Sequence, residues 1–183
     1  MSLTRVRALA VVGILLAAAI VMVVVTLKRD TQRYTAADDP TSCRGDLVPA
    51  SIALPAPKDI KINIYNATDR VNLASSVGAN LTNRKFQVLK MTNDPLHRRV
   101  DGVAVLRYGP KTVGAAWLLR AYFLNDIAMS SMEFDINRED DVVDVVLGDD
   151  FRDLATFTEV NQSVAAEGDP ELPKGTCLAG KDS

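Results

Sequence analysis

Histidine occurs once in these 183 residues, at His97, and cysteine occurs twice, at Cys43 and Cys177. A zinc site needs three or four His, Cys or carboxylate ligands, and a serine-type triad needs a histidine held by a carboxylate. The single histidine and the two distant cysteines leave both kinds of site without their usual residues. The sequence also lacks a phosphate-binding glycine loop, a nucleophile elbow and a dinucleotide fingerprint. We therefore predict no catalytic residue, no metal site and no cofactor, and we place His97 in an exposed loop.

An excess of positive charge is also missing. The formal net charge is -2, and all 23 acidic residues lie beyond Leu27 together with all but two of the 21 basic ones. Residues 28–125 are mostly basic among their charges, whereas residues 126–171 are strongly acidic. A folded nucleic-acid-binding domain would carry net positive charge to displace counterions from phosphates. The composition therefore excludes nucleic acid from the predicted partners.

Charge is wholly absent from Ala8 to Leu27, where Thr26 is the only polar side chain. A helix of this length spans about 30 Å, which is the thickness of the hydrocarbon core of a bilayer. The alternative is a cleaved signal peptide, whose apolar region would be shorter and would end in small residues. Ala17-Ala18-Ala19 is such a triplet, but six further apolar residues follow it. We predict an uncleaved single-pass anchor at 8–27, a cytoplasmic stub at 1–7 and an extracytoplasmic remainder.

The two cysteines lie in loop-like sequence far from each other. Outside the cytoplasm such a pair favours a structural disulfide, and two free thiols are the alternative. We predict a Cys43–Cys177 disulfide that ties the C-terminal extension, residues 154–183, to the segment after the anchor. That segment, residues 28–58, contains Pro40, Pro49 and Pro55 without apolar periodicity, which predicts a tether without regular structure.

Residues 59–153 carry the periodic pattern of one small folded domain. Apolar and polar residues alternate over 60–65 and 132–136, and the alternation at 60–65 predicts a strand with one solvent-facing side. Apolar runs at 86–89 and 103–108 and a short β-branched run at 142–147 complete five predicted strands. Helical spacing appears over 71–81 and 111–124, and again, less regularly, over 154–166. The predicted order within the domain is β-α-β-β-α-β-β. The fold class is therefore α/β (α+β), with a mixed sheet covered by helices on one or both faces.

Three pieces of the sequence together resemble the LytR C-terminal domain family. The first is Ile62-Asn63-Ile64-Tyr65-Asn66-Ala67-Thr68 with Leu73-Ala74 after it, where the family typically has Asn-Gly-Thr and then a helix with Leu-Ala. The second is the strand and helix over 103–119, and the third is the end at 145–151. The match covers about 59–153, and Ala67 stands where the family favours glycine.

The resemblance implies an actinobacterial, membrane-anchored module that keeps the cell envelope intact and has no reaction of its own. Its partners would be a cell-wall polymer or an envelope or membrane protein, besides the bilayer around 8–27. The basic residues at 84–99 could meet anionic wall polymers, although solvation alone also accounts for them. We name five candidate binding residues: Asn66, Thr68, Arg98, Arg99 and Arg107.

Three other interpretations of the sequence remain open. An enzyme acting on envelope glycans would use a pair of acidic residues, for which the run from Glu139 to Asp150 is the obvious source. The same run could bind calcium, although it lacks the glycine-containing loop of an EF-hand. A protein that acts purely in assembly could instead use the anchor helix itself, through the small residues Gly13 and Ala17.

Overall fold

The computed structural model describes residues 43, 45–124 and 126–179. The chain divides into two compact units, 1–40 and 41–183, and the described residues all belong to the second. The predicted stub at 1–7 and anchor at 8–27 lie outside them. Within the described ranges, no helix is both long enough and apolar enough to span a membrane.

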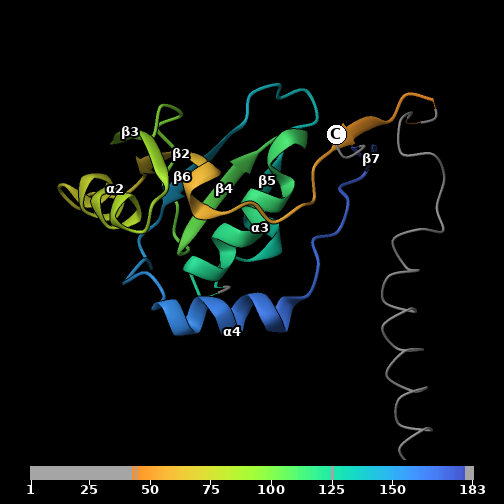
Figure 1. The fold of residues 1–183 in the computed structure, drawn as a ribbon. Helices are drawn as coiled ribbons and strands as arrows, with labels where there is room; N and C mark the ends of the chain where they lie inside the picture. The colour runs from red at the N-terminus through yellow and green to blue at the C-terminus, as the bar shows by residue number, and fades with distance from the viewer. Residues whose placement is uncertain (1–42, 44, 125, 180–183) are drawn as a thin grey trace, which may run out of the picture. The chain divides into compact units, whose positions relative to one another are not determined.

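A five-stranded mixed sheet forms the centre of the second unit (Figure 1). Its strands are β2 (Lys61–Asn66), β3 (Gln87–Asn93), β4 (Ala104–Tyr108), β5 (Met132–Phe134) and β6 (Val142–Leu147). They lie in the order β3-β2-β6-β4-β5. Only the β4–β6 pair is antiparallel. The last strand of the domain, β6, therefore lies between two parallel pairs, β2–β3 and β4–β5.

In each of these two pairs, β2–β3 and β4–β5, a helix connects the strands, because parallel neighbours need a crossover connection. Helix α2 (Leu73–Asn83) joins β2 to β3, and α3 (Val113–Tyr122) joins β4 to β5 after a short 3-10 turn, η2 (Pro110–Thr112). Further 3-10 turns are η1 (Pro57–Asp59) and η3 (Met129–Ser131). The element order from β2 to β6 is the predicted β-α-β-β-α-β-β. The predicted α/β class and mixed sheet are thus confirmed.

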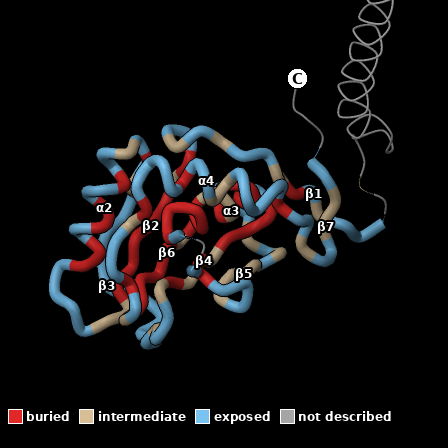
Figure 2. The backbone as a smooth tube through the Cα atoms, turned by 90° about the horizontal axis from the view of Figure 1, so that it is seen from below, coloured by how far each residue is buried: buried red, intermediate tan, exposed pale blue. Residues whose placement is uncertain are grey.

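The hydrophobic core lies between one face of the sheet and the helices. Alternate strand residues such as Ile62, Ile64, Val145 and Leu106 are fully buried and pack with Leu81 of α2 and its apolar neighbours. Figure 2 shows this burial concentrated in β2, β6 and β4, the three middle strands. Helix α4 (Phe157–Glu167) packs on α3. The chain itself therefore covers α3 on the side where α4 packs.

The tether and the C-terminal extension contain regular structure that the sequence did not predict. Strand β1 (Val48–Ala50) pairs in parallel with β7 (Thr176–Leu178), and Pro49 lies opposite Cys177. The Cys43–Cys177 disulfide closes beside this pair, with 5.8 Å between the Cα atoms, as predicted. The expectation that prolines exclude regular structure from 28–58 is wrong at this point, because a strand paired on one edge only tolerates a proline.

Candidate functional site

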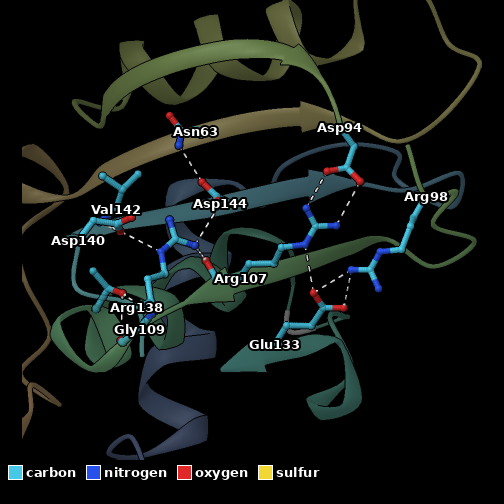
Figure 3. Close-up of polar contacts among 11 residues, drawn as sticks. Asn63, Asp94, Arg98, Arg107, Gly109, Glu133, Arg138, Asp140, Val142 and Asp144 are labelled. Carbon is cyan, nitrogen blue, oxygen red and sulfur yellow. Dashed lines mark hydrogen bonds and ion pairs between the residues drawn. The ribbon is translucent and has the colours of Figure 1, made fainter. Parts of the chain in front are cut away.

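The face of the sheet opposite the helices carries a row of charged side chains (Figure 3). Arg107 of β4 donates from Nη1 to Asp94 Oδ1 at 2.6 Å and from Nε to Glu133 Oε2 of β5 at 3.1 Å. Glu133 also accepts from Arg98, so that four side chains form one chain of ion pairs. Asp94 is 1% exposed and Arg107 is 12% exposed. The Asp94–Arg107 pair is therefore largely withdrawn from solvent, whereas Glu133 and Arg98 are exposed at 39% and 54%.

A second group on the same face is centred on Asp144 of β6. The Asp144 carboxylate accepts hydrogen bonds from Asn63 Nδ2 at 2.7 Å and from Arg138 Nη1 at 3.0 Å. Arg138 also donates to Asp140. The sequence predicted a solvent-facing side for β2, yet Asn63 and Tyr65 are both buried. That prediction is wrong because side chains from β4 and from the loop before β6 cover this face. Burial and the nearby charge of Asp144 raise the pKa of the Tyr65 hydroxyl.

The loop that follows β3, residues 94–103, is pinned across one end of the sheet, and we call it the β3–β4 loop. Arg98 ties it to β5 through Glu133, and Arg99 ties it to Asp69 and Asp149 at 2.6 and 2.7 Å. These two aspartates follow β2 and β6, whose carboxyl ends meet at this edge because the strands are parallel. Between Asp94 and Arg98 the loop exposes Leu96 and His97. It therefore presents these two residues on a fixed support.

Asn66 and Thr68 build the turn after β2. The Asn66 Oδ1 atom accepts from the Thr68 backbone N–H at 3.0 Å and from the Thr68 hydroxyl at 2.8 Å, and its Nδ2 donates to the Arg70 carbonyl. The backbone carbonyl of Asn66 accepts from the N–H of Asp94. Ala67 has no positive φ, so this turn needs no glycine at that position. Asn66 and Thr68 therefore hold the backbone next to the β3–β4 loop.

The structure thus brings all five candidate binding residues to one region, with different roles. Arg107 and Asn66 are inside it and position the loop, whereas Arg98 and Arg99 are more than half exposed at its surface. Sequence reasoning did not single out Asp94, Glu133 or Arg138, and it considered Asp144 only as part of the acidic run. Asp94 and Glu133 pair with Arg107 across 13 and 26 positions, whereas Arg138 and Asp144 are only six positions apart and their pairing went unrecognised. The sequence did contain a signal for Glu133 and Asp144. Each is a charged residue that interrupts an apolar strand, and each lies on the same face of the sheet as a cation of a neighbouring segment.

The acidic run from Glu139 to Asp150 is dispersed among several cations. Asp141 accepts from Lys61 at 2.7 Å, and Asp140, Asp144 and Asp149 each contact an arginine. Among residues 43, 45–124 and 126–179, no three His, Cys, Asp or Glu side chains are grouped so that they could hold a metal ion. The run consequently acts in this structure as a set of ion-pair partners.

Comparison with known proteins agrees with this architecture. Residues 59–151 match the model of the LytR_C family, described as "LytR cell envelope-related transcriptional attenuator". The chain belongs to this family. The match begins just before β2 and ends just after β6, so the LytR_C domain is the five-stranded sheet with α2 and α3. The resemblance predicted from the sequence is confirmed.

Two mycobacterial proteins are similar to this chain. The chain is 28% identical over 125 residues to the cell envelope integrity protein Cei of Mycobacterium tuberculosis. The aligned region covers 66% of this chain and 52% of that protein. The chain therefore spans about half the length of this relative. It is also similar to the crystal structure of the soluble domain of a conserved hypothetical secreted protein from Mycobacterium marinum. That match has 29% identity and a TM-score of 0.47, and it covers 63% of this chain and 73% of the other.

Proposed function

We propose that this protein is a membrane-anchored, extracytoplasmic module that catalyses no reaction and supports the integrity of the cell envelope by binding a wall component or an envelope protein. The LytR_C domain and the likeness to Cei support the envelope role. The disulfide supports a location outside the cytoplasm, because disulfides persist in oxidising compartments. The anchor at 8–27, with the N-terminus in the cytoplasm, is proposed from its uncharged sequence.

The pinned β3–β4 loop is the observation that carries the binding role. Loops held on a rigid scaffold are common binding surfaces, and here Arg98 and Arg99 fix the loop from two sides. His97 lies in the left-handed region at φ 50°, and Leu96 is 55% exposed next to it. Asp94, Arg98 and Arg99 of this loop are each paired with an opposite charge. A partner would therefore be recognised by shape, apolar contact and hydrogen bonds more than by net charge.

Three of the described carboxylates have a pKa that is lowered by their hydrogen-bond partners. A glycan-cleaving enzyme needs one carboxylic acid with a raised pKa to protonate the leaving group. Hydrogen bonds from Lys61 lower the pKa of Asp141, and those from Thr156 lower the pKa of Glu159. At Asp94, burial alone would raise the pKa, but the hydrogen bonds and charge of Arg107 outweigh it and lower it. These shifts have the direction opposite to that of a general acid.

Site-specific photo-crosslinking in intact cells tests the binding role. The full chain would carry a photoreactive amino acid at His97 and, as a matched control, at Lys85. Both positions are exposed and have positive φ, but they lie at opposite ends of β3. We expect a discrete adduct with an identifiable wall fragment or envelope protein from His97 only. Equal adducts at the two positions, or none at His97, would contradict the role of the loop.

A topology experiment tests the anchor and its orientation separately. External protease added to intact spheroplasts should degrade the domain, while an epitope placed before Arg5 should be degraded only after the membrane is opened. Carbonate washing should leave the protein in the membrane fraction. Release by carbonate, or protection of the domain in intact spheroplasts, would reject the proposed arrangement.

A further inference from the structure

A cavity of about 210 Å³ lies between α2 and the segment that leads from β6 to α4. Its lining includes Arg70, Ser76, Asn80, Phe151, Arg152 and Asp153. Three of these side chains come from α2 or the turn before it, and three follow β6. None of the five candidate binding residues lines this cavity. We call it the α2 groove.

Three arginines are fixed around the α2 groove by backbone carbonyls. Arg70 Nη1 donates to the Phe151 carbonyl at 2.6 Å, and Arg152 Nη1 donates to the Asp149 carbonyl at 3.2 Å. Arg84 Nη1 donates to the Ala155 carbonyl, and its Nε donates to Asn80 Oδ1 at 2.8 Å. Each guanidinium has five N–H donors, so these bonds orient the groups and leave further donors available.

These three arginines differ from the other arginines of the described ranges in their ion pairing. The five other arginines of the described ranges, Arg98, Arg99, Arg107, Arg120 and Arg138, each contact a carboxylate at 3.1 Å or less. Among residues 43, 45–124 and 126–179, the three arginines at the groove make no ion pair. Asp153 is the one acidic residue in the lining. The lining therefore holds two cationic groups, Arg70 and Arg152, against one anionic group, and Arg84 lies next to it through its bond to Asn80.

The amino end of α2 adds to the positive potential at the same place. Its N-cap residue, Asn72, is in the left-handed conformation and makes no side-chain cap, and the first turn contains no acidic residue. The first N–H groups of a helix have no partner within the helix and attract anions. Leu73, the first residue of α2, lines the groove together with the guanidinium-bearing side chains.

We propose that the α2 groove binds a phosphate group carried by an envelope constituent. A tetrahedral oxyanion accepts several N–H donors at once, and guanidinium groups with a helix amino end are a recurring way to provide them. The small volume fits the charged group of a larger molecule, whose remainder would lie along the open side. A glycerol-phosphate unit of a wall polymer and a phospholipid headgroup present the same chemistry. This site goes beyond the proposed function, which uses the β3–β4 loop.

Binding to the full chain in a neutral detergent provides the test. Calorimetric titration with soluble glycerol 1-phosphate, and with phosphatidylglycerol incorporated into the micelles at constant detergent concentration, separates the two sources of phosphate. For whichever source binds the wild type, we expect the Arg70→Gln/Arg152→Gln variant to lose affinity at least tenfold. Lys61→Gln, which removes an exposed cation already paired with Asp141, is the matched control and should change affinity less than twofold. Failure of both sources to saturate, or an equal loss in the control, would overturn the proposal.

Two further measurements do not depend on the folding of the double variant. Asp153→Asn removes the carboxylate of the groove and should strengthen binding severalfold. Asp126→Asn, at an exposed position that follows α3, should leave the affinity unchanged. In the wild type, the bound phosphate compound should slow phenylglyoxal modification of Arg70 and Arg152 but not of Arg98. Unchanged affinity in Asp153→Asn, or equal protection of all three arginines, would contradict a site in the α2 groove.

Discussion

Arg107 and Asp94 form a forked ion pair, with Nη1–Oδ1 at 2.6 Å and Nη2–Oδ2 at 3.2 Å. Arg107 is in β4 and Asp94 follows β3, although β2 and β6 lie between these strands in the sheet. The pair therefore holds the start of the β3–β4 loop against the sheet. The backbone carbonyl of Asp94 also accepts from the N–H of His97 at 3.0 Å, which closes a turn at the start of the loop. The loop owes its fixed position to a buried carboxylate.

Removing the cation of this pair should be costly. In Arg107→Met, the Asp94 carboxylate, 1% exposed, would lose its charged partner. Breaking a buried pair by removing one partner costs about 3–5 kcal/mol. We expect a loss of that order in the free energy of unfolding, measured by urea titration in a neutral detergent with the fluorescence of the single tryptophan, Trp117.

Arg98→Met is the matched control for this experiment. Arg98 contacts Glu133, but its side chain is 54% exposed, and exposed ion pairs contribute about 0–1 kcal/mol. The double variant Asp94→Leu/Arg107→Met should recover part of the stability lost by Arg107→Met. Equal losses in Arg98→Met and Arg107→Met would show that Asp94 does not depend on Arg107.

Acid should destabilise the protein through Asp94. Because the pKa of Asp94 is lower in the fold than in the unfolded chain, where aspartate has a value of about 3.9, the folded state binds fewer protons. Its stabilising effect is complete above that value and is lost as the pH falls through the folded pKa. The free energy of unfolding of the wild type should fall below about pH 4 more steeply than that of Asp94→Asn. Parallel pH profiles for the two proteins would contradict this assignment.

Gly114 fixes the packing of the segment after β1 on α3. A Cβ atom at this position would overlap the carbonyl of Ala53, and the Gly114 N–H donates to the Ser51 carbonyl at 3.0 Å. Gly114→Ala should therefore cost about 1–3 kcal/mol, the usual range for overpacking. In the control, Gly78→Ala, the added methyl group meets the Met91 side chain, which is 47% exposed and can move. Thermal unfolding of both variants should show a clear loss for Gly114→Ala only.

The disulfide should contribute measurably to stability. It joins residues separated by 134 positions, and the chain-entropy model gives about 4–5 kcal/mol for a loop of this size. Cys43→Ser/Cys177→Ser should lower the free energy of unfolding by up to that amount. The control is the wild type under reducing conditions, which should behave as the double variant does. Equal stability of the oxidised wild type and the double variant would reject the prediction.

Local sequence patterns predicted the LytR_C domain well and its surroundings less well. The alternation at 60–65, the apolar run at 142–147 and the helical spacing at 71–81 reflect burial, which a short stretch of sequence records directly. The β1–β7 pair has no such signal, because three-residue strands acquire their partners only from the far end of the chain. The ion pairs of Arg107 and Arg138 likewise join residues that sequence spacing does not relate.

The same distinction applies to the candidate site. The sequence determined that the chain has an uncharged segment at 8–27, too few histidines and cysteines for common catalytic centres, and a LytR_C-like order of strands and helices. The tertiary structure decided which arginines are neutralised, since Arg98, Arg99 and Arg107 meet carboxylates while Arg70, Arg84 and Arg152 meet backbone carbonyls. The physical reason is that periodicity records burial residue by residue, whereas the partner of a charge depends on which distant segments the sheet brings together.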